Sequence, residues 1–122
     1  MAMGTANKIL IADRNPRIRE FLRRELSAIG HRVRSVSNAR DLLKVIYSDN
    51  RIDLLILDPD FPYMDAVELA RKIIDRIPQI PVVLHCIRGA EDLSGFDGAN
   101  AVHIEKNGHS VEILKETIRR LL

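Results

Sequence analysis

The sequence predicts an α/β fold in which strands and helices alternate around a parallel sheet, and three observations support this prediction. Short apolar runs alternate with amphipathic stretches along the chain, which is typical of repeated strand and helix units. Two of the apolar runs stop abruptly at a carboxylate, at Asp13 and at Asp58. The length of 122 residues suits one domain with one core and is too short for two.

The predicted elements follow one another in regular order. Strands are expected over 8–12, 32–36, 53–57, 81–86 and 101–104, and helices over about 15–29, 39–48, 65–76 and 110–121. The first helix has apolar residues at helical spacing, and these are Ile18, Phe21, Leu22, Leu26 and Ile29. Gly30 is expected to end that helix, and Ser110 is placed to cap the last one.

The pattern weakens between Cys86 and Val102, where Gly89, Gly95 and Gly98 fall close together. Each glycine costs a helix interior roughly 0.5–1 kcal/mol relative to alanine. A fourth helix, if it forms here, is therefore expected to be short, irregular or mobile. Residues 1–7 precede any pattern and are expected to be a disordered tail.

Charge and cysteine content narrow the class of protein. Residues 1–40 contain nine Lys or Arg against three acids, whereas the whole chain has a net charge of only +2. No aromatic residue except Phe21 is interleaved with these arginines, so a solvated helix face is favoured over direct nucleic-acid binding. The single cysteine, Cys86, excludes an intramolecular disulfide and fits a reducing compartment. No apolar run is long enough for a membrane span and no signal pattern opens the chain, so a cytoplasmic protein is expected.

Asp58 and Asp13 are the first candidate site residues. In open α/β sheets, ligands bind in the crevice beyond the carboxyl ends of the strands. Two carboxylates in that crevice would form an anionic pocket suited to a hard cation. The alternative is that Asp58 only caps the turn or helix that follows it.

Four separated segments resemble the response-regulator receiver domain, the phosphoaccepting module of two-component signalling. They are the strand and helix start at 8–19, the loop from Asp58 through Met64-Asp65-Ala66-Val67-Glu68-Leu69, the strand Pro81-Val82-Val83-Leu84-His85-Cys86, and Ile104-Glu105-Lys106. The segments agree with the family in order and spacing, and the resemblance covers residues 8–122. It implies a flavodoxin-like, doubly wound sheet of five parallel strands in the order 2-1-3-4-5, with helices on both faces.

The resemblance also implies a function. Asp58 would accept a phosphoryl group from a histidine kinase or a phosphotransfer protein and so switch a fused or separate output domain. Mg²⁺ would be held by Asp13, Asp58 and the backbone carbonyl of Asp60, while Lys106 and the residue at Cys86 would contact the phosphoryl group. The domain would catalyse at most its own phosphorylation and dephosphorylation. Homodimers through the fourth and fifth helices are common in the resembled family.

Several positions depart from the family pattern. Arg14 stands at the second acidic position, which should weaken Mg²⁺ binding, although its guanidinium could instead pair with Asp13 or Asp58, or point into water. Cys86 replaces the hydroxyl residue that bonds the phosphoryl group in the family, and its thiol is a poor hydrogen-bond donor. The alternative is that Cys86 only packs as a small hydrophobic residue. His103 aligns with the aromatic residue of the fifth strand that rotates between two positions in the family, and the alternative is a core histidine whose ring is hydrogen-bonded. Asn107 replaces the usual proline.

These departures leave alternatives open. A degenerate pseudo-receiver would bind a protein partner without phosphate. Leu57-Asp58-Pro59-Asp60 also resembles the Asp-x-Asp motif of haloacid-dehalogenase-type phosphatases, in which Asp60 would be the acid/base, but two strand and helix units precede the motif here. Whether the Asp60 side chain points into the pocket is the structural test of that alternative. Nucleic-acid binding through the arginine-rich first helix has the least support.

Overall fold

The computed structural model describes residues 7–48, 51–60, 66–76, 80–87 and 100–122. In this part of the chain one sheet of five parallel strands has the order β2-β1-β3-β4-β5, as predicted. The strands are β1 Lys8–Ala12, β2 Arg32–Val36, β3 Leu54–Leu57, β4 Val82–Cys86 and β5 Ala101–Glu105. The helices are α1 Pro16–Ala28, α2 Ala39–Tyr47, α3 Ala66–Arg76 and α4 Ser110–Leu121. Every predicted boundary lies within one residue of the observed one.

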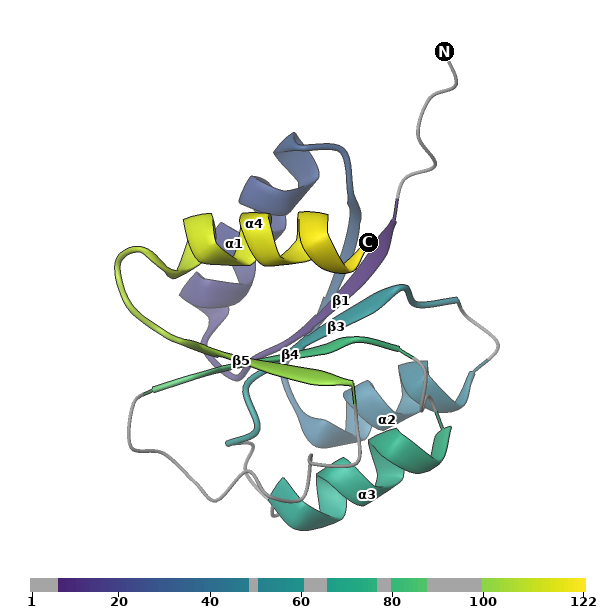
Figure 1. Cartoon of the computed structure of the whole chain (residues 1–122). Helices are drawn as coiled ribbons and strands as arrows, with labels where there is room; N and C mark the ends of the chain where they lie inside the picture. Colours follow the sequence, from purple (N-terminus) through teal and green to yellow (C-terminus); the bar gives the residue numbers. More distant parts are fainter. Residues whose placement is uncertain (1–6, 49–50, 61–65, 77–79, 88–99) are drawn as a thin grey trace.

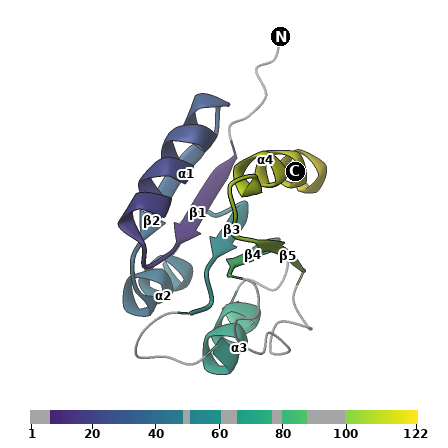
Figure 2. The same cartoon turned by 90° about the vertical axis from the view of Figure 1, so that its left-hand side faces the viewer.

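The helices cover both faces of the sheet (Figure 1). Alternate residues of each strand point to opposite faces, so the core divides into two clusters. Leu10 of β1 belongs to the cluster under α2 and α3, whereas Ile9 and Ile11 belong to the cluster under α1 and α4. Figure 2 shows the two groups of helices, α1 with α4 and α2 with α3, after a turn of 90°. The central strand β3 is buried along its full length, as expected of a parallel sheet covered on both faces.

Helix α1 shows how local sequence sets the boundaries. The Asn15 side chain accepts hydrogen bonds from the backbone N–H groups of Arg17 and Ile18, and Pro16 occupies the first helical position. Gly30 follows the helix with a φ of 100°, in the left-handed region that glycine adopts without steric cost. The predicted start and stop signals are thus confirmed.

Two predictions about the helices are wrong. Phe21 and Ile29, assigned to the apolar stripe of the first helix, are 43% and 49% exposed, because the buried stripe consists mainly of Leu22 and Leu26. Ser110 does not cap α4: it is the first helical residue, and its hydroxyl donates to the backbone oxygen of Asn107 instead.

Some predictions fall outside the described residues. The irregular fourth helix predicted between 89 and 98 is one of them, and residues 1–6 of the predicted tail are another. Asn7, also assigned to the tail, is tied to the sheet, since its backbone oxygen accepts a hydrogen bond from the Arg32 N–H at 2.9 Å. Among the described helices, none has the length and apolar character needed to cross a membrane.

Candidate phosphoacceptor site

Three of the predicted site residues meet at the carboxyl edge of the sheet. Asp13 directly follows β1, Asp58 follows β3 and Lys106 follows β5. Their backbone N–H groups continue the sheet ladder: that of Asp13 donates to Val36, that of Asp58 to Ala12 and that of Lys106 to Cys86. The sheet itself therefore fixes where each of these side chains begins.

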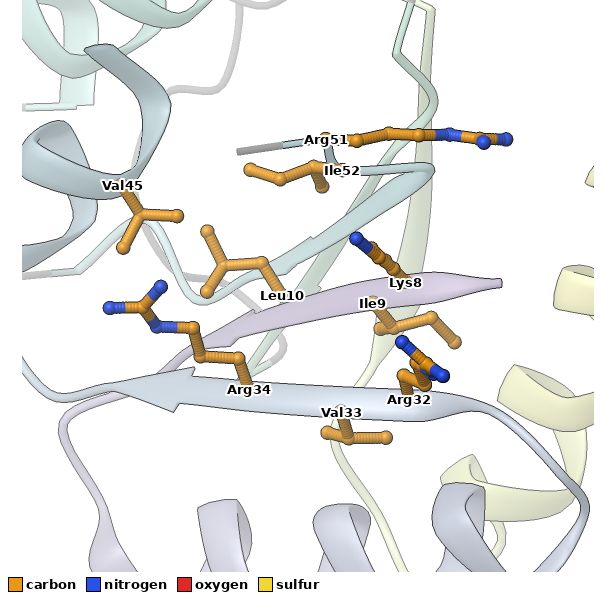
Figure 3. A pocket seen from close by; sticks show the side chains of 9 residues that line it. All are labelled: Lys8, Ile9, Leu10, Arg32, Val33, Arg34, Val45, Arg51 and Ile52. Atoms are coloured by element: carbon orange, nitrogen blue, oxygen red, sulfur yellow. The ribbon is translucent and has the colours of Figure 1, made fainter. Parts of the chain in front are cut away.

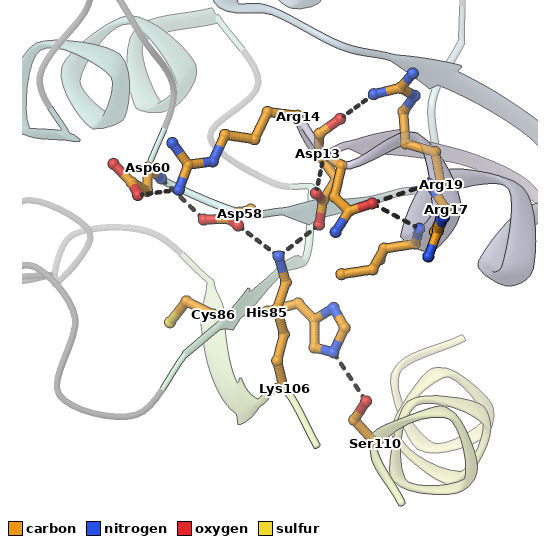
Figure 4. A network of polar contacts seen from close by, with 12 residues as sticks. Asp13, Arg14, Arg17, Arg19, Asp58, Asp60, His85, Cys86, Lys106 and Ser110 are labelled. Carbon is orange, nitrogen blue, oxygen red and sulfur yellow. Dashed lines mark hydrogen bonds and ion pairs between the residues drawn. The ribbon is translucent and has the colours of Figure 1, made fainter. Parts of the chain in front are cut away.

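Lys106 bridges the two carboxylates (Figure 4). Its Nζ lies 2.8 Å from Asp13 Oδ2 and 2.5 Å from Asp58 Oδ2. The three side chains are almost entirely buried, with exposed fractions of 11% for Lys106, 3% for Asp13 and 7% for Asp58. Burial alone would lower the pKa of Lys106, but the hydrogen bonds and charges of Asp13 and Asp58 outweigh it and raise the pKa above its usual value. The lysine is thus held as a cation.

The other oxygen of each carboxylate is bound by the backbone. Asp13 Oδ1 accepts from the Asn15 N–H at 2.8 Å, and Asp58 Oδ1 accepts from the Asp60 N–H at 2.9 Å. Arg19, which the sequence analysis did not assign to the site, donates from Nη1 to the backbone oxygen of Asp13 at 2.7 Å. Both carboxylates are therefore oriented from two sides.

Arg14 adopts neither of the arrangements that the sequence analysis considered. Its guanidinium pairs with Asp60 Oδ2 at 2.9 Å rather than with Asp13 or Asp58, and it does not simply point into water. Both side chains are about half exposed, at 53% and 45%, so the ion pair contributes little stability. The ion pair instead fixes where the Asp60 carboxylate lies, because that carboxylate is bound to Arg14.

Cys86 and His103 contact each other. Cys86 is buried at the end of β4, and its Sγ lies 3.0 Å from Nε2 of His103. Burial, reinforced by the charge of Asp58, raises the pKa of the thiol, so Cys86 remains neutral. His103 is exposed, which excludes the alternative that it is a core imidazole.

Comparison with known proteins identifies the family. The family described as "Response regulator receiver domain" matches residues 9–116. The chain belongs to this family. The receiver domain is 31% identical over 117 residues to the response regulator MprA of Mycolicibacterium vanbaalenii, with 94% of the chain and 50% of the relative covered. The chain thus spans about half the length of the curated relatives it matches.

Solved structures agree with the receiver fold. The response regulator TrrA from Thermotoga maritima, in complex with Mg²⁺ and BeF, has a TM-score of 0.81 and 28% identity, covering 95% of this chain and 99% of that chain. TrrA in complex with the histidine kinase ThkA gives a TM-score of 0.80 and 27% identity, covering 95% and 98%. A CheY-like receiver domain from Methanospirillum hungatei, at 23% identity over 96% of this chain and 94% of that one, supports the fold with a TM-score of 0.81.

The residues of this receiver domain fit a magnesium ion chemically. Mg²⁺ prefers oxygen ligands and keeps several waters, so one or two carboxylates are enough to hold it. Asp13 and Asp58 converge on one point, where Lys106 now binds both of them. Among the described residues no group of three or more acidic, histidine or cysteine side chains forms a fuller metal site. Asp13, Asp58 and the Asp60 carbonyl therefore remain the predicted ligands.

The geometry gives the phosphatase alternative no support. An acid/base residue must come within hydrogen-bond reach of the reacting oxygen. The Asp60 carboxylate points toward Arg14 and is held there in an ion pair (Figure 4). Only its backbone N–H contacts Asp58.

His85 is a polar residue near the site that the sequence analysis missed. It is 3% exposed on β4, and its Nε2 lies 3.0 Å from Ser110 Oγ at the start of α4. Because the Ser110 hydroxyl also lies 3.0 Å from the Asn107 oxygen and donates to it, the histidine donates through Nε2–H. Burial first, and then the charge of Lys106, lower the His85 pKa to about 4. The only hint in the sequence was a histidine within an otherwise apolar strand.

Proposed function

We propose that Asp58 of this receiver domain accepts a phosphoryl group from a phosphohistidine of a histidine kinase or phosphotransfer protein. The observation that carries the proposal is the bridging of Asp58 and Asp13 by one buried lysine. Structures of the similar response regulator TrrA, one in complex with Mg²⁺ and BeF and one in complex with the histidine kinase ThkA, support the proposal. The site would act in the cytoplasm and signal to an attached or separate output domain.

The transfer is a single displacement at phosphorus. An Asp58 oxygen forms the new O–P bond while the P–N bond of the phosphohistidine breaks, and the electron pair returns to the imidazole nitrogen. A carboxylate is a weak nucleophile toward an anionic phosphoryl group, so positive charge must be present at the site. Lys106 supplies one such charge from within the protein. A bound Mg²⁺ would supply the rest by neutralising phosphoryl oxygens.

The remaining groups of the pocket orient Asp58. The Asp60 N–H holds one carboxylate oxygen at 2.9 Å, which directs the second oxygen toward Lys106. Asp13 keeps Lys106 anchored from the other side. When Asp58 becomes phosphorylated, Lys106 can follow the phosphoryl oxygens without losing its bond to Asp13. We further propose that Cys86 and His103 transmit this change, and that the domain has no enzymatic activity beyond its own phosphorylation and dephosphorylation.

The intact mass of the protein tests this proposal. After incubation with Mg²⁺ and acetyl phosphate, the wild-type protein should gain the mass of one phosphoryl group, and Asp58→Asn should gain none. Asp75→Asn is the matched control, because Asp75 is an exposed carboxylate on α3. It should be phosphorylated like the wild type. Equal gain by Asp58→Asn would refute the assignment of the phosphoacceptor.

A second function is favoured by the pairs at Arg14 and Cys86. Arg14 pairs with the side chain of Asp60, and Cys86 contacts the exposed His103. A module that binds its protein partner independently of phosphate could use the surface that these two pairs form. In that case no mass would be gained at high donor and Mg²⁺ concentrations, and Asp58→Asn would bind the partner as the wild type does.

A further inference from the structure

We propose that the outer edge of β2 binds an extended acidic segment of a partner protein, which adds to the sheet as a further strand. This surface lies on the edge strand of the sheet and contains none of Asp13, Asp58 and Lys106. Arg19, which lines the second cavity and bonds the backbone oxygen of Asp13, is common to the surface and the site. Three independent features of β2 support it: a cavity, an excess of positive charge and a row of free backbone groups.

The cavity lies between β1, β2 and the end of α2 (Figure 3). Its volume is about 190 Å³. Leu10, Val45 and Ile52 give it an apolar floor. Four cationic side chains surround this floor: Lys8, Arg32, Arg34 and Arg51. An apolar hollow with charged groups at its margin suits a ligand that carries both apolar and anionic groups.

A second cavity continues the first along the strand. The two share Arg34 and Val45, and the second extends past Ser35 to Ser37. It adds the cations Arg19 and Lys44. From Arg32 to Ser37 the combined groove follows β2 for roughly 16 Å at the usual rise of a strand. This shape fits an extended chain better than a compact small molecule.

The positive charges of the groove are only partly balanced within the described residues, since Arg51 pairs with Asp53 at 3.0 Å. Arg32 and Arg34 are exposed, and no acidic partner is found for either in that part of the chain. Arg32 is also the direct cross-strand neighbour of Lys8, and like charges in this arrangement repel. Of the nearby acids, Asp41 is bonded to Asn38 at the start of α2. Acidic side chains from a partner would relieve this repulsion.

The backbone of β2 offers hydrogen bonds on its outer side. The Arg32 N–H and the Val36 oxygen both bond toward β1. In a parallel ladder, successive residues direct their N–H and C=O groups to alternate sides. The backbone groups of Val33 and Ser35 therefore face away from β1, and β2 has no second strand partner among the described residues.

These features together favour a peptide. A free strand edge recognises another peptide backbone, which nucleic acids lack. Cations on an edge strand also discourage pairing between copies of the same chain, so a second copy is disfavoured by charge. An acidic extended segment satisfies the outward-facing backbone groups and the cations of β2 at once, whereas the apolar floor lies over β1 on the inner side of β2.

Fluorescence anisotropy with a labelled peptide of about ten alternating glutamate and valine residues tests the proposal. The wild-type protein should bind this peptide, with an affinity that falls as salt is raised. Arg34→Glu should weaken binding at least tenfold, whereas Arg120→Glu should change it less than about twofold. Arg120 is the matched control because it is an exposed arginine on α4, on the other face of the sheet.

A second measurement separates strand addition from simple charge attraction. The same peptide with alternate backbone nitrogens methylated keeps its charges but loses the donors needed for a ladder, and it should bind at least tenfold more weakly. This comparison uses the unchanged protein, so it does not depend on a variant that folds. Equal binding of the methylated peptide, or of an oligothymidylate of the same length, would overturn the proposal. So would equal weakening by Arg34→Glu and Arg120→Glu.

Discussion

At the scale of single residues, Arg14 is the most informative departure in the pocket. It brings a cation to the mouth of the proposed magnesium site and pairs with Asp60, whose carbonyl is a predicted ligand. A positive charge this close opposes a divalent cation electrostatically. Weaker Mg²⁺ binding stays a prediction, and it rests on the charge of Arg14.

Replacing Arg14 by aspartate should strengthen Mg²⁺ binding about tenfold, equivalent to roughly 1.4 kcal/mol. The substitution removes the cation and adds an oxygen ligand of the type that Mg²⁺ prefers. Isothermal titration calorimetry measures the affinity directly. Arg120→Asp, far from the site, is the control and should leave it unchanged. Equal Mg²⁺ affinity of Arg14→Asp and the wild type would show that Arg14 does not weaken Mg²⁺ binding.

His85 should make the folded protein sensitive to mild acid. Its pKa is about 4 in the folded state against 6.5 for a free histidine, so between these values the unfolded chain binds a proton that the folded chain does not. Stability from this group is complete above pH 6.5 and is lost as the pH falls toward 4. Between pH 7 and pH 5 the loss is about 2 kcal/mol.

Urea unfolding at the two pH values checks this prediction. His85→Leu should lose about 2 kcal/mol less than the wild type over the same interval. His31, whose pKa is also lowered by burial, is present in both proteins and cancels in the comparison. Identical pH dependence in the two proteins would exclude His85 as the sensitive group.

At the scale of secondary structure, the junction between α1 and β2 depends on one backbone conformation. Gly30 has a φ of 100°, whereas a residue with a side chain loses roughly 1–2 kcal/mol in the left-handed region. Gly30→Ala should therefore lower the free energy of unfolding by about that amount. Gly108 is the matched control, since a methyl group there meets open space and its φ is not positive.

Chemical denaturation of both glycine variants gives the comparison. Gly108→Ala should be neutral or raise stability by about 0.4–1 kcal/mol, because alanine restricts the unfolded chain. A loss of equal size in the two variants would mean that the side chain, rather than the backbone conformation of Gly30, causes the effect.

The elements also show what sequence reasoning can and cannot reach. Strands and helices were predicted to within a residue because buried parallel strands are continuous apolar runs and because Asn15, Pro16 and Gly30 signal a helix start and stop locally. The role of Ser110 was mistaken because its partner, His85, lies on β4 and only the tertiary structure brings the two together. The Arg14 to Asp60 pair likewise joins residues from two loops.

The site divides in the same way. Asp13 and Asp58 could be predicted from the abrupt ends of two strands, whereas Lys106 was identified through the family resemblance. The Lys106 ammonium group binds both carboxylates. This contact could not be predicted without the sheet order, which places β1 and β3 side by side and β5 on the edge beyond β4. Arg19, which supports Asp13 through its backbone oxygen, had no signal in the sequence.

At the scale of the whole molecule, the buried cluster of Lys106, Asp13 and Asp58 couples the site to global stability. Removing the cation leaves two carboxylates in a buried position without a counter-charge, which typically costs about 3–5 kcal/mol. Lys106→Met should therefore lower the free energy of unfolding by about that much at pH 7.

Equilibrium unfolding in urea tests this coupling. Lys115→Met is the matched control: it removes a lysine that pairs with Glu25 between α4 and α1, but in a partly exposed position, so its loss should be much smaller. Adding Asp58→Asn to Lys106→Met should recover part of the stability by removing one uncompensated charge. A Lys106→Met protein as stable as the Lys115→Met protein would contradict the account.

The bond from Lys106 to Asp13 and Asp58 also has a consequence for biosynthesis. The chain is made from its amino terminus, so Asp13 and Asp58 emerge from the ribosome well before the lysine that binds them. Until β5 has joined the sheet, Lys106 cannot bind the two carboxylates. A nascent or truncated domain that ends before Lys106 would carry Asp13 and Asp58 without the cation that binds both of them. The cluster is therefore complete only after β5 and the residue that follows it have been synthesised.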